Sequence, residues 1–282
     1  SSNNGPAIQS NENPMMIGEN PDARNRTWSG IIDDVGIWDR PITEAEIATI
    51  WNGGDGTALV TAGGGMVELV PELLAYWPFD GDLVDKVAGL EGEAQGTVED
   101  TDGVLGGAVD LGSEENWIKV DAEDGWLAPA SDEDAMSISL WQKLNVVRNS
   151  STFWVRAESA PSNARNFQAH IPWGNNNIYF DTAGCCGGGD TRIVKLAEID
   201  FLEWHHFVFV KDGENKSIYI DGELFHEGVN TAPLFDDWTY LAIGSSGTGD
   251  FAAAIVDEFG VWGRAITADE VADIYNGGAG AP

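Results

Sequence analysis

Three carboxylates lie close together in the segment Glu198-Ile-Asp-Phe-Leu-Glu203. On a β-strand, alternation would place Glu198 and Asp200 on one face, and a bulge would be needed to bring Glu203 to that face. Two carboxyl groups about 5 Å apart can hydrolyse a glycosidic bond with retention, one acting as the acid and the other as the nucleophile. Glycoside hydrolysis is therefore the first candidate chemistry.

A second candidate site lies in residues 166–193, where aromatic and polar residues surround a glycine-rich stretch. The rings of Trp173 and Tyr179 can stack on a sugar, and the neighbouring amide, carboxylate and guanidinium groups suit its hydroxyl groups. Loops on a rigid scaffold commonly carry such residues. The alternative is that both rings fill the core and the glycines form a long turn. The predicted ligand-binding residues are Trp173, Asn175, Tyr179, Asp181, Asp190 and Arg192.

Cys185 and Cys186 are adjacent in this segment and are the only cysteines in the chain. Neighbouring Cα atoms are about 3.8 Å apart, below the roughly 4.4 Å lower end for ordinary disulfides, so a vicinal disulfide would be a strained ring. A reduced pair and a soft-metal ligand pair are the alternatives. With only four histidines in the chain, a zinc site around this pair has few further ligands.

His205 and His206 are a third group with chemical potential. On a strand they point to opposite faces, so they cannot bind one metal ion together, and we expect one of them to pack against the core. Nucleophile-elbow, zinc-protease and phosphate-loop motifs are absent from the sequence.

The charge balance restricts the partners. The chain has 14 Lys and Arg against 47 Asp and Glu, a formal net charge of −33. Such a surface repels nucleic acid and anionic membranes, keeps a protein soluble and attracts divalent cations. No apolar run approaches the about 20 residues of a membrane span, and the first residues do not resemble a signal peptide. We expect no nucleic-acid binding, no membrane insertion, and a mature or excised fragment.

An internal repeat organises the chain. The segment IDDVGIWDRPITEAEIATIWNGG from Ile32 and the segment VDEFGVWGRAITADEVADIYNGG from Val256 are identical at half of their positions. Each copy begins with a β-like run and continues with a Thr-x-x-Glu capping box, Thr43 with Glu46 and Thr267 with Glu270, which predicts a short helix that Asn-Gly-Gly ends.

The position of the two copies predicts the domain boundaries. The late copy closes a region of more than two hundred residues, whereas the early copy closes a short one. We therefore interpret residues 1–54 as the C-terminal tail of a preceding domain, residues 55–66 as a linker and residues 67–282 as one complete domain. A tail of this size cannot bury a core alone, so it would pack on the main domain or on another chain.

Between the copies, short segments with alternating or aromatic-rich patterns are separated by Gly, Asp and Asn clusters, and no helical pattern is long enough for a parallel crossover. This pattern predicts an all-β sandwich or barrel. The predicted strands are Leu74 to Phe79, Ala108 to Leu111, Trp117 to Val120, Met136 to Lys143, Thr152 to Arg156, Phe167 to Ile171, Asn177 to Asp181, His205 to Lys211, Ser217 to Ile220 and Tyr240 to Ile243.

The main domain resembles the bacterial laminin-G-like domains of the concanavalin A-like lectin/glucanase superfamily. The resemblance is carried, in the family's order, by AYWPFDGDLVDKVAG from Ala75, MSISLWQK from Met136, WHHFVFVKDGENKSIYIDGEL from Trp204 and the closing segment from Val256. It implies a two-sheet antiparallel jelly-roll sandwich with short terminal helices. It also implies a secreted or cell-surface setting, and a similar Cys-Cys loop in subfamily members.

The resemblance also has implications for a metal site and for a catalytic site. It implies a structural calcium ion between the first and last strands, with Asp80, Asp82, Asp85 and Asp257 as the matching carboxylates, although Asp-Gly pairs also form ordinary turns. The segment Glu198 to Glu203 matches the E-I-D-x-x-E signature of laminarinase-type hydrolases. In those enzymes the signature lies well upstream of the strand that here begins at Trp204, so we interpret it as the approach to that strand.

The sequence thus predicts a non-catalytic extracellular binding or adhesion module, calcium-stabilised and carbohydrate-binding, with a glycan or an extracellular protein as its partner. One alternative is a structural subunit of an extracellular assembly that self-associates through residues 1–54. The other is a glycoside hydrolase that uses Glu198, Asp200 and Glu203.

Overall fold

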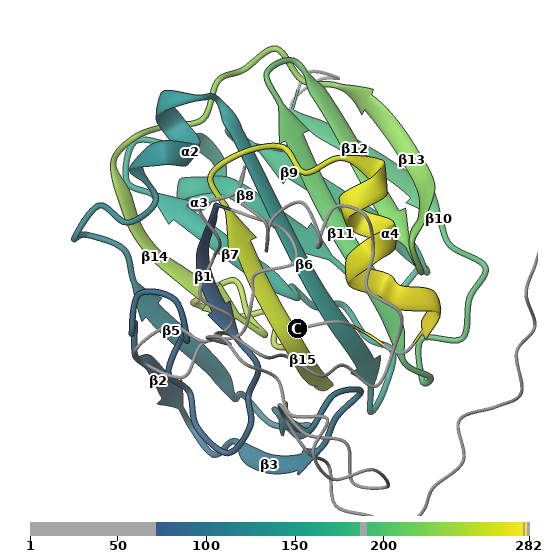
Figure 1. The fold of residues 1–282 in the computed structure, drawn as a ribbon. Helices are drawn as coiled ribbons and strands as arrows, with labels where there is room; N and C mark the ends of the chain where they lie inside the picture. Colours follow the sequence, from purple (N-terminus) through teal and green to yellow (C-terminus); the bar gives the residue numbers. More distant parts are fainter. Residues whose placement is uncertain (1–71, 187–190, 279, 281–282) are drawn as a thin grey trace, which may run out of the picture. The chain divides into compact units, whose positions relative to one another are not determined.

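The computed structural model describes residues 72–186, 191–278 and 280, which form two antiparallel β-sheets packed face to face (Figure 1). The larger sheet has the order β13-β12-β11-β6-β15-β4-β3, with β1 also paired to β15, and the smaller has the order β10-β9-β8-β7-β14-β5-β2. The strands are β1 (Leu73–Trp77), β2 (Gly92–Gln95), β3 (Glu99–Asp102), β4 (Gly107–Asp110), β5 (Trp117–Asp121), β6 (Ala135–Leu144), β7 (Phe153–Ala157), β8 (Arg165–His170), β9 (Asn177–Thr182), β10 (Arg192–Leu196), β11 (His205–Asp212), β12 (Asn215–Ile220), β13 (Glu223–Val229), β14 (Trp238–Ile243) and β15 (Ala254–Trp262). The predicted all-β, two-sheet jelly-roll sandwich is confirmed.

The core lies between the two sheets because the strands of each sheet alternate. In β7, Phe153 and Val155 enter the core cluster, whereas Trp154 and Arg156 lie on the opposite face. Aromatic rings from both sheets meet there, with Phe153 and Phe209 5.4 Å apart between centroids. Burial of these large apolar side chains is the main stabilisation of the sandwich.

The same alternation gives the smaller sheet a second, outward face. The strand register places Arg192 of β10 beside Asp181 of β9, Asp181 beside Gln168 of β8, and Gln168 beside Trp154 of β7. These side chains form one row across four strands, on the face away from the core. The sheet therefore presents a row of polar and aromatic groups on a rigid surface.

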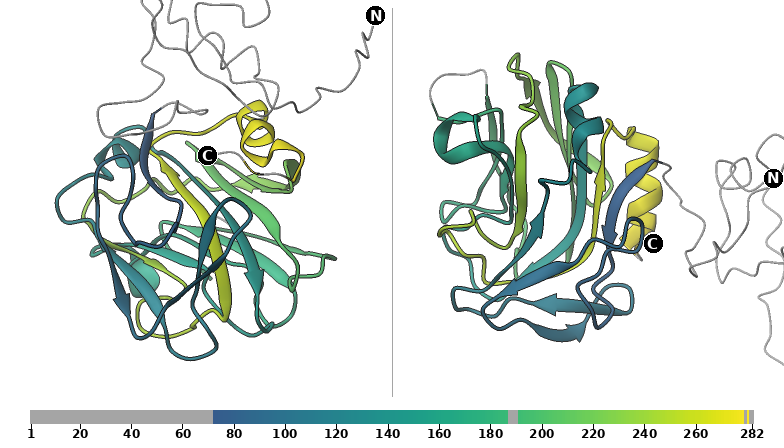
Figure 2. Two further views of the ribbon diagram at one scale, coloured as in Figure 1. Left: turned by 60° about the horizontal axis from the view of Figure 1, so that its bottom comes forward. Right: turned by 90° about the vertical axis from the view of Figure 1, so that its left-hand side faces the viewer.

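Four short helical segments accompany the strands in the described part of the chain: α2 (Ala128–Asp132), α3 (Pro161–Ala164), α4 (Ala268–Tyr275) and the 3-10 turn η2 (Asn276–Gly278). The predicted capping box of α4 is confirmed, since Thr267 Oγ1 accepts from the Glu270 N–H and the Glu270 carboxylate accepts from the Thr267 N–H. The helix packs on the outer face of the larger sheet through Val271 and Ile274 (Figure 2).

The described helices include none that is both long and apolar enough to cross a membrane. The predicted tail at residues 1–54 and the predicted linker at residues 55–66 lie outside the described residues. The proposed domain boundaries, the tandem arrangement and self-association through the tail therefore stay predictions.

Candidate functional site

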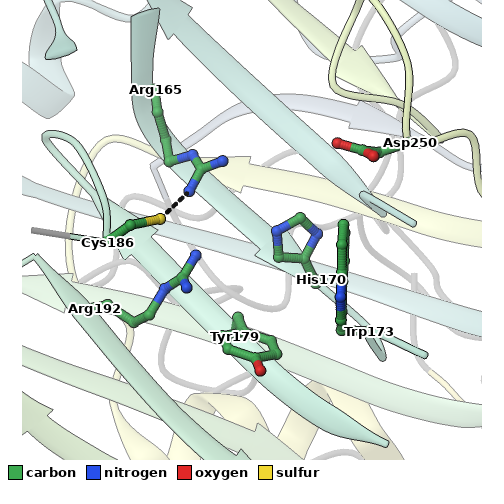
Figure 3. Close-up of a pocket in the computed structure, with 7 residues that line it drawn as sticks. All are labelled: Arg165, His170, Trp173, Tyr179, Cys186, Arg192 and Asp250. Atoms are coloured by element: carbon green, nitrogen blue, oxygen red, sulfur yellow. Dashed lines mark hydrogen bonds between the residues drawn. The ribbon is translucent and has the colours of Figure 1, made fainter. Parts of the chain in front are cut away.

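A pocket of about 270 Å³ opens on the outward face of the smaller sheet (Figure 3). Two adjacent strands and their connections supply most of its wall, and the loop between β14 and β15 adds one residue from a distant part of the chain. The lining residues are Arg165 and His170 of β8, Trp173 in the β8–β9 turn, Tyr179 of β9, Cys186 just after β9, Arg192 of β10 and Asp250 in the β14–β15 loop.

A buried carboxylate organises the charged side of this pocket. Asp181 has 0% of its surface exposed and receives two hydrogen bonds from Arg192, Nε at 2.6 Å and Nη2 at 2.7 Å, and one from Arg165 Nη1 at 3.0 Å. Such charge-assisted, bidentate bonds are the strong class of protein hydrogen bonds. Asp181 therefore fixes both guanidinium groups in place.

Aromatic rings support the same two guanidinium groups. The Arg165 guanidinium lies 4.3 Å from the Trp154 ring centroid, and that of Arg192 lies 4.6 Å from the Tyr179 ring centroid. These cation–π contacts add to the ion pairs and limit the motion of both side chains. The charged wall of the pocket is therefore preorganised.

His170 forms an uncharged wall beside the two rings. Its Nδ1 lies 2.7 Å from the Ser150 carbonyl oxygen, which can only accept, so Nδ1 carries the proton and Nε2 is left as an acceptor. Burial lowers the pKa of His170 to about 4, which keeps the ring neutral near pH 7. Trp173 packs against it edge-on at 4.5 Å between centroids, and Tyr179 does so at 5.8 Å.

Buried polar atoms without a protein partner gather in the strands beneath the pocket. Both amide atoms of Gln168, Nε1 of Trp154, Oγ1 of Thr152 and Nε of Arg165 have no hydrogen-bond partner within the described residues. Native proteins rarely leave such atoms unsatisfied, and ordered water or a bound molecule commonly completes them. These atoms have almost no exposed surface, so ordered water below the pocket is the partner expected for them.

Residues 1–48 and 113–272 match the family described as the concanavalin A-like lectin/glucanases superfamily. The chain belongs to this superfamily. No curated protein matches it at a significant level.

Solved structures of other proteins have a similar fold. Domain 4 of AbnA, an extracellular GH43 arabinanase from Geobacillus stearothermophilus in complex with arabinotriose, is 21% identical with a TM-score of 0.56, over 72% of this chain and 97% of that one. The binding domain of botulinum neurotoxin DC in complex with SialylT is 13% identical with a TM-score of 0.56, over 74% and 52%. In complex with rat synaptotagmin II it is 14% identical with a TM-score of 0.56, over 72% and 50%. This chain thus spans about half of the toxin domain.

The structure brings most of the predicted ligand-binding residues of this superfamily member to one place. Trp173, Tyr179 and Arg192 line the pocket, Asp181 holds the arginines, and Asn175 Nδ2 donates to Tyr179 Oη at 3.0 Å. Asp190 lies outside the described residues. Their role in binding stays a prediction, and the pocket residues that the sequence analysis missed are Arg165, His170 and Asp250.

The adjacent cysteines belong to the same pocket. Their sulfur atoms are bonded to each other, and Arg165 Nη1 lies 3.7 Å from Cys186 Sγ (Figure 3). The vicinal disulfide, one of the three predicted alternatives, is thus the form that the structure contains. The disulfide thus lies beside the charged wall of the pocket.

The carboxylates of the predicted hydrolase signature lie elsewhere. Glu198, Asp200 and Glu203 are exposed and belong to the connection between β10 and β11, not to a strand. Asp200 Oδ1 accepts from the Leu202 N–H at 3.0 Å, as in an ordinary turn. The interpretation of this segment as the approach to β11 agrees with this placement, and the strand alternation needed to align the three carboxylates is absent from it.

The four predicted calcium ligands do not come together as one set. Asp85 is buried and accepts from four backbone N–H groups, those of Tyr76, Val87, Ala88 and Leu90. Asp82 is exposed and pairs with Lys86 at 2.8 Å. Both therefore stabilise the loop after β1, and no group of three or more His, Cys, Asp or Glu in the described ranges is arranged to hold a metal ion.

Asp257 is the predicted calcium ligand that has a carboxylate oxygen without a hydrogen-bond partner among the described residues. Its Oδ2 accepts from the N–H groups of Val104 and Leu105, whereas its buried Oδ1 has no partner within the described residues. Burial raises the pKa of Asp257 to about 7 and that of the neighbouring Glu258 to about 8, and the charge of Asp80 adds to both shifts. Glu258 also accepts a hydrogen bond from Tyr76 Oη.

Proposed function

We propose that this protein is a non-catalytic carbohydrate-binding module that works outside the cell, on a glycan of an extracellular or cell-surface partner. The observation that carries the proposal is the pocket itself, where the faces of Trp173 and Tyr179 adjoin fixed donors and the His170 acceptor. Aromatic faces beside a few well-placed polar groups are the usual features of a small-ligand site. The arabinotriose and SialylT complexes of the similar structures are consistent with it.

The charges of the pocket also favour binding over hydrolysis. Hydrolysis of a glycoside commonly needs two carboxyl groups free to exchange protons or attack the sugar. Asp181 is held by two guanidinium groups and has no exposed surface, so it cannot act as the acid or the nucleophile. Asp250, on the rim, is then the one carboxylate left among the described lining residues.

Replacing Tyr179 with alanine is expected to weaken glycan binding about tenfold or more, because a stacking face is lost and Arg192 loses its support. A glycan array followed by titration calorimetry on the strongest ligand would measure this. Tyr219→Ala is the matched control, since Tyr219 is also half-buried but lies on the larger sheet. Equal losses in both variants, or an array without any bound glycan, would contradict the proposal.

We also propose that calcium stabilises the module through the unpartnered oxygen of Asp257, with backbone carbonyl groups or water completing its ligands. The neighbouring carboxylates Asp80 and Glu258 are not arranged with Asp257 as a ready metal-binding group in the described ranges, but their charge favours a cation nearby. The unpartnered buried oxygen of Asp257 fits a hard cation, which prefers carboxylate oxygens, whereas Asp82 and Asp85 do not fit because their oxygens are already engaged. Calcium would supply positive charge to a buried acidic cluster.

Calcium in hundredfold excess over its Kd is expected to raise the melting temperature of EDTA-treated protein by about 5 to 10 °C. Asp257→Asn should remove this increment, and Asp82→Asn, which alters an exposed carboxylate, should keep it. Differential scanning calorimetry with and without calcium measures all three proteins. An unchanged melting temperature in the parent protein would exclude a structural calcium ion.

A further inference from the structure

Two guanidinium groups share one carboxylate at the charged wall of the pocket. Arg165 and Arg192 carry two positive charges, and Asp181, the carboxylate bonded to both, carries one negative charge. Figure 3 shows both guanidinium groups on one side of the pocket, with His170 and Trp173 across from them. Positive charge is therefore concentrated at this wall, with Asp250 as the negative charge elsewhere in the lining, in a chain whose net charge is −33.

We propose that the pocket recognises a sugar that bears a carboxylate, and that Arg165 and Arg192 are the residues that select it. This inference rests on the proposed carbohydrate-binding function and names the class of ligand at the same site. The carboxylate would lie between the two guanidinium groups, and the sugar ring would lie against Tyr179 and Trp173.

The remaining hydrogen-bond donors support this assignment. Arg192 uses Nε and Nη2 on Asp181, which leaves Nη1 without a partner among the described residues. Arg165 uses Nη1 on Asp181 and Cys186, which leaves Nη2 without a partner among the same residues, whereas its Nε is fully buried and lies out of reach of a ligand. A planar carboxylate matches the fork of a guanidinium group better than a hydroxyl group does.

Burial increases the energetic effect of the positive charge on Arg165. Only 8% of the Arg165 surface is exposed, so water compensates its charge poorly. A neutral sugar would cover the pocket and leave Arg165 and Arg192 with Asp181 and the rim residue Asp250 as their counter-charges, whereas a ligand carboxylate would lie directly against the guanidinium groups. Asp250 is the competing carboxylate. Burial lowers the pKa of Arg165, and the charge of Asp250 is among those that oppose this shift. Because Asp250 is exposed, water and salt weaken its attraction for the arginines.

The fixed positions of both arginines reduce the cost of binding. Each guanidinium group stacks on an aromatic ring and is bonded to Asp181 before a ligand arrives. Side chains that are already ordered lose little entropy on binding, so the charge contact contributes more of its strength to affinity. The geometry is that of a preformed anion site built into a sugar-sized pocket.

The test uses glycans that differ only at the acid group. An array of oligosaccharides with uronic or sialic acids and their neutral counterparts is followed by calorimetry on the strongest acidic ligand and on its methyl ester. The acid is expected to bind about 10- to 100-fold more tightly than the ester, because esterification removes the charge-assisted bonds. Equal affinity for the ester, or binding confined to neutral glycans, would overturn acid recognition and leave the proposed function standing. Failure to bind any glycan would refute both.

Substitutions test whether the arginines cause the preference for the acid over its ester. Arg192→Gln is expected to reduce the ratio of acid to ester affinity to near one, and Asp250→Asn is expected to raise acid affinity a few-fold by removing a repulsive charge. Lys119→Gln removes the same positive charge from the same sheet, on β5 and away from the pocket, and should leave the ratio unchanged. If Arg192→Gln does not fold, Arg192→Met, an uncharged side chain of similar length that can still pack on Tyr179, takes its place. A ratio that persists in the folded variant would show that another group selects the acid.

Discussion

Replacing Asp181 with alanine is expected to destabilise the fold by about 3 to 5 kcal/mol, the typical cost of removing one partner of a buried ion pair. Asp181 has no exposed surface, and its removal would leave Arg165 buried without a counter-charge and Arg192 without its bidentate partner. The free energy of unfolding, from urea denaturation near neutral pH, measures the loss. Glycan binding should be abolished in the same variant, because both arginines lose their fixed positions.

The matched control for this substitution is Asp121→Ala. Asp121 also lies on the smaller sheet and is 3.9 Å from Lys119, but its side chain is 67% exposed. An exposed ion pair typically contributes less than about 1 kcal/mol, so little stability should be lost. Asp181→Asn separates charge from shape, since the amide keeps the volume of the carboxylate. If Asp181→Ala costs no more than Asp121→Ala, Asp181 does not organise the pocket as described.

The strands that the sequence predicted are those that face the core. Alternation is visible in β7, where Phe153 and Val155 point inward, and in β11, where Phe207 and Phe209 do. The four strands absent from the prediction, β2, β3, β10 and β13, are the two edges of each sheet. Edge strands bury little, and β3 reads Glu-Asp-Thr-Asp with one half-buried residue, so no hydrophobic period marks them.

The candidate pocket was partly predictable because its wall is built from consecutive strands. The predicted residues Trp173, Tyr179, Asp181 and Arg192 follow one another from the β8–β9 turn through β9 to β10, so proximity in the chain becomes proximity in space. Asp250 could not be found in this way. It reaches the pocket from the β14–β15 loop, which the pairing of β14 with β7 and the bridge between Ser151 and Phe251 bring to the site.

The roles of the carboxylates were the hardest to predict, because the role of each depends on which backbone N–H groups surround it. The resemblance implies that Asp85 is a metal ligand, but one N–H group of β1 and three of the loop after it surround its carboxylate. Asp257 has the same residue type and a buried oxygen left over. A turn-forming aspartate and a ligand-binding one have the same sequence signature, and the number of N–H groups within reach distinguishes them.

The adjacent residues His205 and His206 have pKa values shifted in opposite directions, because their surroundings differ. His206 is 1% exposed, packs against Trp141 at 5.2 Å and Tyr275 at 6.0 Å between centroids, and hydrogen-bonds Ser139 through Nε2. Burial lowers its pKa to about 3. His205 hydrogen-bonds the Asp221 carboxylate, and this bond raises the pKa of His205. The expectation that one histidine packs inside is met by His206, on the face that α4 covers.

His206 should make the protein sensitive to acid. The unfolded chain protonates this histidine below about pH 6.5, whereas the native state keeps it neutral, so stability falls as the pH decreases from there. At about pH 4.5 the loss attributable to His206 is about 2 to 3 kcal/mol. His206→Phe keeps an aromatic ring and cannot titrate, so between about pH 7.5 and about pH 4.5 it should lose that much less stability than the parent protein.

The stability of His206→Phe is compared with that of the parent protein at each pH, because acid also relieves the repulsion among the 47 Asp and Glu residues. This relief acts in the opposite direction and raises stability. This relief is common to both proteins and cancels when their unfolding free energies are subtracted at each pH. His205→Gln provides a control of opposite sign. Its parent histidine has a raised pKa and stabilises the fold at low pH, so this variant should lose more stability in acid. Parallel pH profiles for His206→Phe and the parent protein would show that His206 does not titrate on unfolding.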